Sequence, residues 1–399
     1  IIPIPLDHKG GFILRSLVFT PQKNEWYFGA EAIDQYMEND GEGRFLRSLK
    51  KFLAEPQYTG TQIHNKNYQI EDLVAIFLRE MKRRADQFIG KNIDSVIMGR
   101  PAKYSQISAN DQLAETRMHK ACELAGFREI IFCPEPLAAG LDFDKAYTKD
   151  KIVLIADFGG GTSDFTLLKL NQQKYTQENV LGISGIFKAG DALDGEMMKK
   201  FVSKHFGSQF EFKLPMGNEI LKFPKNLLTK ICSPAHITHL RAKEVWEYLK
   251  KIHQFAKDHE HKEKLDQLFT VVECQLGYPI FQKIEDFKIN ITKTDKDPLT
   301  FTFSYPGIKI REEISPRDYD HAMEEVVLEI MDTLMDVFTQ SGLKVTDVDE
   351  VVLTGGTAQF HLIQESLSST FGPEKLIEHN VYQSVVNGLA QFALTLIRL

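Results

Sequence analysis

The stretch of this sequence best suited to chemistry is a glycine-rich turn flanked by two aspartates, Asp157-Phe158-Gly159-Gly160-Gly161-Thr162-Ser163-Asp164. Consecutive glycines let the backbone adopt conformations that other residues avoid, so its N–H groups can approach an anion closely. The Thr162 hydroxyl can donate to a phosphate oxygen. Asp157 stands where a strand should end, and its carboxylate can hold Mg²⁺ directly or through water. The turn therefore predicts a phosphate site with Asp157 as its metal ligand, although a plain glycine-rich hairpin has the same pattern.

Two further motifs could contribute to the same site. Val351-Val352-Leu353-Thr354-Gly355-Gly356-Thr357 runs from a buried strand into a glycine pair and then into a helix, whose N-terminus attracts anions. Pro134-Glu135-Pro136 fixes the backbone around Glu135, which could orient water or a metal ion near phosphates. A tight strand–helix connection and an acidic helix start explain these two motifs equally well when each is taken alone. They gain weight as partners of the turn at 157–164.

The triplet Asp157-Phe158-Gly159 also matches the magnesium motif of protein kinases. A protein kinase should carry an HRD catalytic loop upstream and a V-A-I-K lysine on an early strand. Neither motif occurs in this sequence. The protein-kinase interpretation is therefore set aside.

The segments around the motifs predict strands and helices in both halves of the chain. Apolar runs at Lys151–Ala156 and Phe165–Leu170 flank the glycine turn and predict a strand–turn–strand unit. Residues 29–53 are predicted to be helical, 205–270 to form an inserted helix-rich subdomain, and 286–310 to form two strands. Strands that alternate with helices in both halves predict an α/β protein with two related lobes that share a cleft.

Composition narrows the class of protein. A length of 399 residues favours two domains or lobes, and 43% hydrophobic with 26% charged residues is typical of a globular protein in water. The net charge of −7 argues against a nucleic-acid partner, and the apolar runs are too short to span a membrane. The 4 cysteines form no CxxC pair, so zinc and haem sites have no support, and their scarcity fits a reducing compartment such as the cytoplasm.

Taken together, the motifs resemble the ATPase domain of the DnaK-type heat-shock chaperone family, in the actin-like ATPase superfamily. The turn at 157–164 resembles the family's second phosphate loop, D-x-G-G-G-T-x-D, and Gly355-Gly356-Thr357 resembles its adenosine motif. The segment from Gly99-Arg100-Pro101-Ala102 through Pro134-Glu135-Pro136, and the segment Ser384–Ala390, resemble its two connecting regions. The resemblance covers nearly the whole chain. The insert at 205–260 is similar to that of the YegD-like chaperones, which lack a peptide-binding domain.

The resemblance implies a two-lobed actin-like ATPase (ribonuclease H-like) fold with an inserted helix-rich subdomain. It also implies ATP or ADP with Mg²⁺ as cofactors and a protein partner or client. The implied division is a lobe I core at 1–13, 93–147 and 378–399 with an outer subdomain at 14–92, and a lobe II core at 148–190 and 309–377 with an outer subdomain at 191–308.

Carried over residue by residue, the resemblance implies a nucleotide site in the cleft. Asp157 would hold the magnesium shell, Lys50 would position the attacking water, and Glu135 would belong to the same catalytic network. Phosphoryl transfer needs mostly positioning and charge stabilisation, which such groups supply. The implied nucleotide-binding residues are Gly159, Gly160, Gly161, Thr162, Asp164, Gly355, Gly356, Thr357 and Glu273.

The sequence departs from the family pattern in two main places. The family's opening hairpin, with its first phosphate turn, would precede Ile1. We expect these roughly two dozen residues to belong to the protein, because deleting central strands would expose a sheet edge. After Glu273, the positions of a lysine and an arginine that contact adenosine hold Leu276 and Gly277, and Pro279 should disrupt the helix.

Three functions therefore stay open on the sequence alone. The first is an ATP-binding and ATP-hydrolysing module, a chaperone or nucleotide-dependent regulator whose lobes close on ATP and reopen after hydrolysis. The second is a degenerate nucleotide-binding lobe pair that acts as an interaction protein with little or no ATPase activity. The third is a sugar or small-molecule kinase, for which the sequence offers no dedicated catalytic aspartate.

Overall fold

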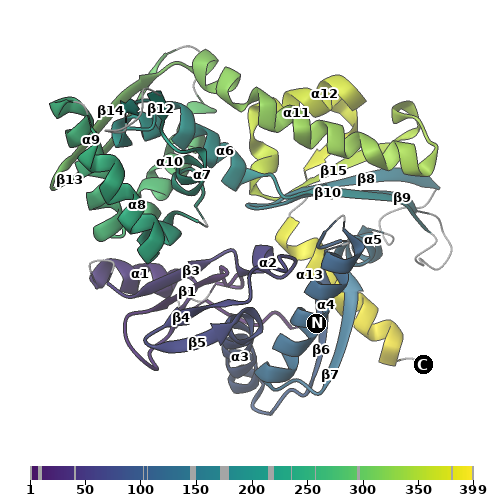
Figure 1. Ribbon diagram of the computed structural model, residues 1–399. Helices are drawn as coiled ribbons and strands as arrows, with labels where there is room; N and C mark the ends of the chain where they lie inside the picture. Colours follow the sequence, from purple (N-terminus) through teal and green to yellow (C-terminus); the bar gives the residue numbers. More distant parts are fainter. Residues whose placement is uncertain are drawn as a thin grey trace.

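The computed structural model describes residues 2–7, 11–39, 42–101, 103–105, 107–143, 150–170, 179–213, 220–234, 236–256, 258–293, 297–378 and 381–397. The protein is mixed α/β, and Figure 1 shows it as two halves with the last helix, α13 (Val381–Ile397), returning to the half that holds the N-terminus. There α13 packs against α5 (Glu135–Phe143). No helix in these ranges combines the length and the apolar character needed to cross a lipid bilayer.

The second half is built on a five-stranded sheet of order β10-β9-β8-β15-β16. In it β8 (Lys151–Phe158), β9 (Ser163–Leu170) and β10 (Val180–Ile186) form an antiparallel meander. The strands β15 (Glu350–Thr354) and β16 (Leu376–Glu378) extend it in parallel beyond β8. The strand–turn–strand unit predicted around residues 157–164 is confirmed as the β8–β9 hairpin.

The two faces of this sheet belong to different hydrophobic cores. Val153 and Ile155 of β8 pack with the α5 residue Ala139, and Val385 of α13 lies against this cluster. Leu154 and Ala156 point to the opposite face, into the large core that includes α11 (Pro316–Ser341) and α12 (His361–Phe371). Because side chains alternate along a strand, the continuous apolar run of β8 is what a strand covered on both faces requires.

Among the described residues, the first half holds three small sheets and a helical layer. Strands β1 (Leu17–Thr20), β2 (Tyr27–Phe28) and β3 (Arg44–Arg47) form the first sheet, and the hairpin β4 (Gly60–Ile63) and β5 (Lys66–Gln69) forms the second. The parallel pair β6 (Ser95–Arg100) and β7 (Glu129–Pro134) forms the third, and α4 (Ser108–Ala125) connects its strands. Helix α3 (Ile70–Ile89) packs against α4 over the core of this half.

The prediction of a continuous helical region at 29–53 is wrong in its middle. The structure has α1 (Ala30–Glu38), then β3, then the short helix α2 (Leu49–Phe52). Strand β3 pairs along its whole length with β1, a partner that no local pattern around residue 44 reveals. Ser48 separates β3 from α2 with a left-handed backbone, φ 55°, which no helix interior contains.

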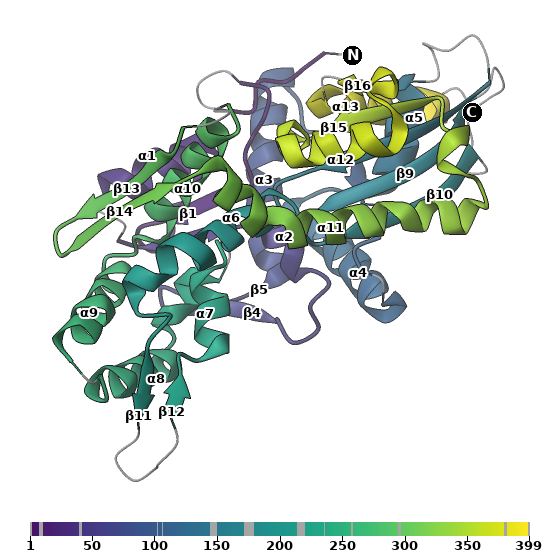
Figure 2. The ribbon, with the colours of Figure 1, turned by 90° about the horizontal axis from the view of Figure 1, so that it is seen from above.

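The helix-rich insert gathers at one end of the second half (Figure 2). It contains α6 (Gly190–Met197), α7 (Lys225–Ile231), α8 (Lys243–Gln254), α9 (His259–Glu273) and α10 (Gly277–Ile291), with the strand pair β11 (Glu211–Lys213) and β12 (Ile220–Lys222). The hairpin β13 (Leu299–Tyr305) and β14 (Ile308–Ile314) follows.

Two sequence predictions in this insert have different outcomes. The strands predicted over 286–310 begin only at Leu299, because Ile284, Phe287 and Ile291 fall on one buried face of α10 at helical spacing. The helix break predicted at Pro279 is confirmed. Helix α9 ends at Glu273, and Pro279 lies in the first turn of α10, where a missing N–H costs nothing.

Candidate functional site

The glycine turn connects β8 to β9 at the edge of the cleft. Asp157 and Asp164 are cross-strand partners at its base, and the Gly159 N–H donates to the Thr162 carbonyl at 2.9 Å. Gly160 is open, with no atom within 4 Å of where its Cβ would be, whereas a Cβ on Gly161 would collide with the Lys51 side chain. None of the three glycines has a positive φ. Close approach therefore favours glycine at position 161, and no left-handed backbone is involved.

Two other segments of the second half support the turn through hydrogen bonds to its carbonyls. The Thr357 hydroxyl donates to the Gly159 carbonyl at 2.8 Å, and the Asp191 N–H, at the start of α6, donates to the Gly160 carbonyl at 2.6 Å. Gly355 has φ 84°, and a Cβ there would collide with the carbonyl oxygen of Phe158. The structure thus brings together the two glycine motifs that the sequence singles out. Gly356 follows in a 3-10 turn that leads toward α12.

The two carboxylates at the base of the turn are poorly compensated. Burial raises the pKa of Asp164 to about 7. The positive charge of Lys50 opposes this shift, the negative charge of Glu135 adds to it, and a hydrogen bond from Thr162 also opposes it. Burial also raises the pKa of Asp157, although Thr354 donates a hydrogen bond to its carboxylate. Two carboxylates on neighbouring strands, short of positive charge, are a donor set that suits Mg²⁺, which takes one or two carboxylates with water and phosphate oxygens.

Lys50 and Glu135 meet in the first half, facing this hairpin. The Lys50 Nζ lies 3.1 Å from the Glu135 Oε1, joining α2 to the start of α5. Partial withdrawal from water lowers the pKa of Lys50, but the charges of Glu135, Tyr104 and Asp164 outweigh it and raise the pKa overall. The structure therefore brings Lys50 and Glu135 together and places Asp164 near enough to act on Lys50.

Three charged residues at the mouth of the turn were missed by the sequence analysis. Arg47 and Lys51 both pair with Asp191, at 3.1 and 2.9 Å, and the Asp191 side chain is only 12% exposed. These pairs cross the cleft, because Arg47 and Lys51 come from the first half and Asp191 from the first turn of α6. The Lys51 side chain also covers Gly161. The available signal was an acid just after Gly190 at a helix start, a position that favours negative charge.

Glu273 is not brought to the turn. It lies exposed at the C-terminal end of α9, and its side chain forms no ion pair or hydrogen bond with the residues that the structure describes. Beyond it, Gln275 has φ 53°, and Tyr278 packs on Phe45 with ring centroids 4.9 Å apart. Ala102 and the side chains of Pro136 and Ser384, which belong to the motifs quoted above, lie outside the described residues.

Side chains of the described ranges form no group of three or more His, Cys, Asp or Glu that could hold a metal ion by itself. A site at Asp157 and Asp164 therefore depends on oxygen atoms that a ligand or water would add. This is the usual situation for Mg²⁺ at a nucleotide, which keeps several waters and phosphate oxygens in its shell.

Comparison with known proteins places the chain in a family. A family model described as Hsp70 protein matches residues 47–223 and 249–396. The chain is 23% identical to the chaperone protein HscA of Buchnera aphidicola subsp. Schizaphis graminum over 319 residues, 80% of this chain and 40% of that protein. It is 23% identical to the chaperone protein DnaK of Halobacterium salinarum over 366 residues, 92% of this chain and 48% of that protein. The chain thus spans less than half the length of these relatives. Since the family match covers well over half of the chain, the chain belongs to the Hsp70 family.

Proposed function

We propose that this chain is an ATP-binding and ATP-hydrolysing module that reports its nucleotide state to a protein partner or client. One observation carries the proposal. The glycine turn is fixed by Thr357 and α6, and it faces the Lys50–Glu135 pair from across the cleft. Fixed donors and charges around the transferring phosphate are what phosphoryl transfer requires.

The fold supports the same proposal at a coarser level. A sheet of three antiparallel strands extended by two parallel ones, closed by α5 and α13 on one face, fits the two-lobed actin-like (ribonuclease H-like) arrangement. In this arrangement the outer subdomains would be residues 14–92 and 191–308. A YegD-like specialisation and a cytoplasmic location belong to the proposal as well.

In the proposed reaction, different residues would have different roles. The backbone of Gly159–Thr162 would bind the β- and γ-phosphates, and Lys51 and Arg47 would add positive charge at the mouth of the turn. Lys50, held by Glu135, would position the attacking water. Asp157 and Asp164 would hold Mg²⁺, which supplies charge neutralisation for the phosphates. Gly355, Gly356 and Thr357 support the turn from behind, next to where the nucleoside would lie.

Calorimetric titration of the full chain with ATP·Mg²⁺ tests the proposal. Wild type should bind, and Asp157→Asn should weaken magnesium-dependent binding by at least about tenfold because one carboxylate of the metal shell is lost. Asp150→Asn, an acid-to-amide change at an exposed position just before β8, is the matched control and should bind like wild type. Absence of heat at millimolar ATP·Mg²⁺ would overturn the proposal.

A second candidate function follows from the cleft-spanning ion pairs. Arg47 and Lys51 are already satisfied by Asp191, and Tyr278 packs in the segment where the family presents an arginine to adenosine. Both features favour a lobe pair that holds its shape without nucleotide and acts as an interaction protein. The titration above separates the two functions, since only the first predicts heat.

A further inference from the structure

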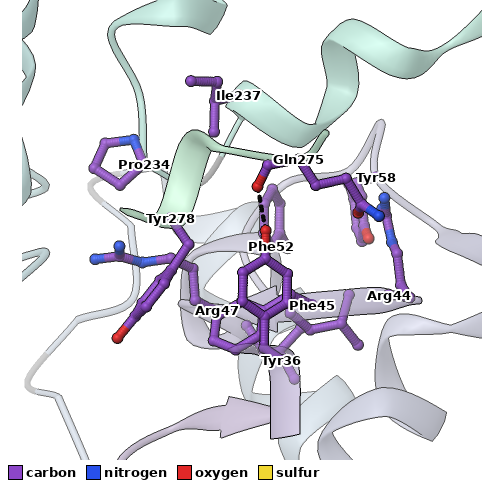
Figure 3. Close-up of a pocket in the computed structure, with 12 residues that line it drawn as sticks. Tyr36, Arg44, Phe45, Arg47, Phe52, Tyr58, Pro234, Ile237, Gln275 and Tyr278 are labelled. Atoms are coloured by element: carbon purple, nitrogen blue, oxygen red, sulfur yellow. Dashed lines mark hydrogen bonds between the residues drawn. The ribbon is translucent and has the colours of Figure 1, made fainter. Parts of the chain in front are cut away.

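A small pocket lies between the two halves, apart from the glycine turn. Its walls from the first half include Tyr36, Phe45 and Phe52, and its walls from the second half include Ile237 and Tyr278 (Figure 3). Its cavity volume is about 40 Å³. A single water needs about 10–15 Å³ by the same kind of measure, so the pocket has room for a group about as large as three waters. We call it the outer pocket.

Arg44 is the unexplained group of the outer pocket. In the part of the chain that the structure describes, no carboxylate pairs with its guanidinium, and its buried Nε has no hydrogen-bond partner. Burial lowers the pKa of Arg44. Tyr58 opposes this shift, whereas the neighbouring Arg241 adds to it by charge repulsion. Arg47, which lines the same pocket and extends away from Arg44 in Figure 3, is by contrast neutralised by Asp191.

A half-buried guanidinium without an anion is costly to maintain, and buried polar atoms without partners are rare in native proteins. The planar guanidinium fork is matched best by an oxyanion that accepts two parallel hydrogen bonds. The surrounding aromatic rings, such as the stacked pair Phe52 and Tyr58 at 4.4 Å, exclude water and strengthen such a contact. We propose that the outer pocket binds a small oxyanion, a phosphate or a carboxylate group, through Arg44.

An anion in this position would act on both halves at once. Arg44 belongs to β3, whereas Arg241 and Tyr278 belong to the insert of the second half. The same boundary is already crossed by a hydrogen bond from the Tyr36 hydroxyl to the Gln275 carbonyl. A ligand that pairs with Arg44 and relieves its repulsion with Arg241 therefore favours the arrangement in which the halves are together. The inference does not depend on nucleotide binding.

The experiment is calorimetric titration of the full chain with inorganic phosphate and, in a second arm, with acetate. Wild type should bind phosphate, acetate or both, and Arg44→Gln should weaken that binding at least tenfold. Arg128→Gln, at an arginine just before β7 whose side chain is 83% exposed, is the matched control and should stay within twofold of wild type. The arm that shows binding identifies the oxyanion as phosphate or as a carboxylate.

Lys51→Gln separates the two sites: it should weaken any phosphate binding at the glycine turn, while the binding that depends on Arg44 persists in this variant. Loss of binding in Lys51→Gln with retention in Arg44→Gln would assign the anion to the turn and overturn the inference, as would absence of binding in both arms. If Arg44→Gln fails to fold, Arg241→Gln replaces it. That side chain is exposed, so the fold should survive and affinity should fall at least threefold; unchanged affinity would overturn the inference.

Discussion

The largely buried carboxylate of Asp191 in the second half forms ion pairs with both Arg47 and Lys51 of the first half. The two cations lie where a phosphate on the glycine turn would need them, because the Lys51 side chain covers Gly161. In the proposed function, Asp191 holds both cations when no phosphate is bound. A nucleotide bound as proposed would compete with this carboxylate for the same positive charge.

Asp191→Asn should raise nucleotide affinity. Loss of the carboxylate frees Arg47 and Lys51, and about 1 kcal/mol, typical of a partly exposed ion pair, corresponds to roughly a fivefold change. Calorimetric titration with ADP measures the change in affinity. The control is Glu329→Gln, which breaks the more exposed pair with Lys188. A weaker affinity in Asp191→Asn would mean that Asp191 helps to hold the nucleotide or its metal.

The glycines of the two motifs should differ sharply in their tolerance of alanine. Gly160→Ala should change the free energy of unfolding by less than about 0.5 kcal/mol, because its Cβ would meet open space. Gly355→Ala should cost about 2–4 kcal/mol, because it combines a positive φ with a clash against backbone. Urea denaturation compares the two. Equal costs would show that the close approach of Gly355 to Phe158 is absent in solution.

At this scale the sequence predicted the turn, Lys50 and Glu135, but it could not predict Arg47, Lys51 and Asp191 as a group. The glycine run and the proline-bracketed glutamate have local signatures. The ion pairs join residues about 140 positions apart in the sequence. Each of these residues resembles an ordinary surface charge in its own segment. Glu273, taken from the resemblance, lies exposed at the end of α9.

Helix α6 links the glycine turn to the helix-rich insert. Its first N–H groups bond to the carbonyls of Gly159 and Gly160, and further along Asp194 pairs with Lys288 of α10 at 2.6 Å. Burial raises the pKa of Asp194 to about 6, although Lys288 opposes the shift. The position of α6 thus depends on a buried acid that titrates near neutral pH.

Asp194 should make stability depend on pH in a defined window. Its folded pKa lies above the unfolded value of about 3.9, so its contribution is full below about pH 4 and is lost as pH rises through about 6. Relative to Asp194→Asn, wild type should lose up to about 3 kcal/mol of unfolding free energy over that window. Denaturant titrations at pH 4, 5, 6 and 7 measure this difference, and a difference that is constant with pH would contradict it.

The elements themselves were predictable to unequal degrees. The β8–β9 hairpin followed from two apolar runs around a glycine turn, because both of its strands are adjacent in sequence. Strand β3 was taken for helix, since its pairing with β1 lies outside any local window. The start of α10 was marked by Pro279, whereas its end was misjudged because Phe287, Ile289 and Ile291 alternate as a strand would.

At the scale of the whole molecule, the halves are joined below the cleft by α5 and α13 and above it by the Asp191 pairs and the Tyr36–Gln275 hydrogen bond. The lower junction is apolar and buried, whereas the upper one combines a few polar contacts with the packing of Tyr278 on Phe45. Opening should therefore occur at the upper contacts first, because polar contacts near the surface are individually weak.

The double variant Asp191→Asn with Tyr36→Phe should loosen the upper contacts alone. Hydrogen–deuterium exchange should rise in β3 and in the joint between α9 and α10, while α5 and α13 keep the wild-type rate. A control pair, Glu329→Gln with Tyr248→Phe, changes similar groups away from the cleft and should leave both regions unchanged. Faster exchange in α5 or α13 of the test variant would show that the two junctions open together.

Side chains of β8 alternate between two cores, so substitutions on its two faces should affect two different properties. These are the contact between the halves and the rigidity of the second half. Conservative trimming at Val153 or Ile155 affects the side on which α5 and α13 lie, so it tunes how freely one half swings on the other. Trimming at Leu154 or Ala156 reaches only the interior of the second half and changes its rigidity. Natural variation along this one strand therefore adjusts the contact between the halves and the rigidity of the second half as separate traits, with the residues of the glycine turn left untouched.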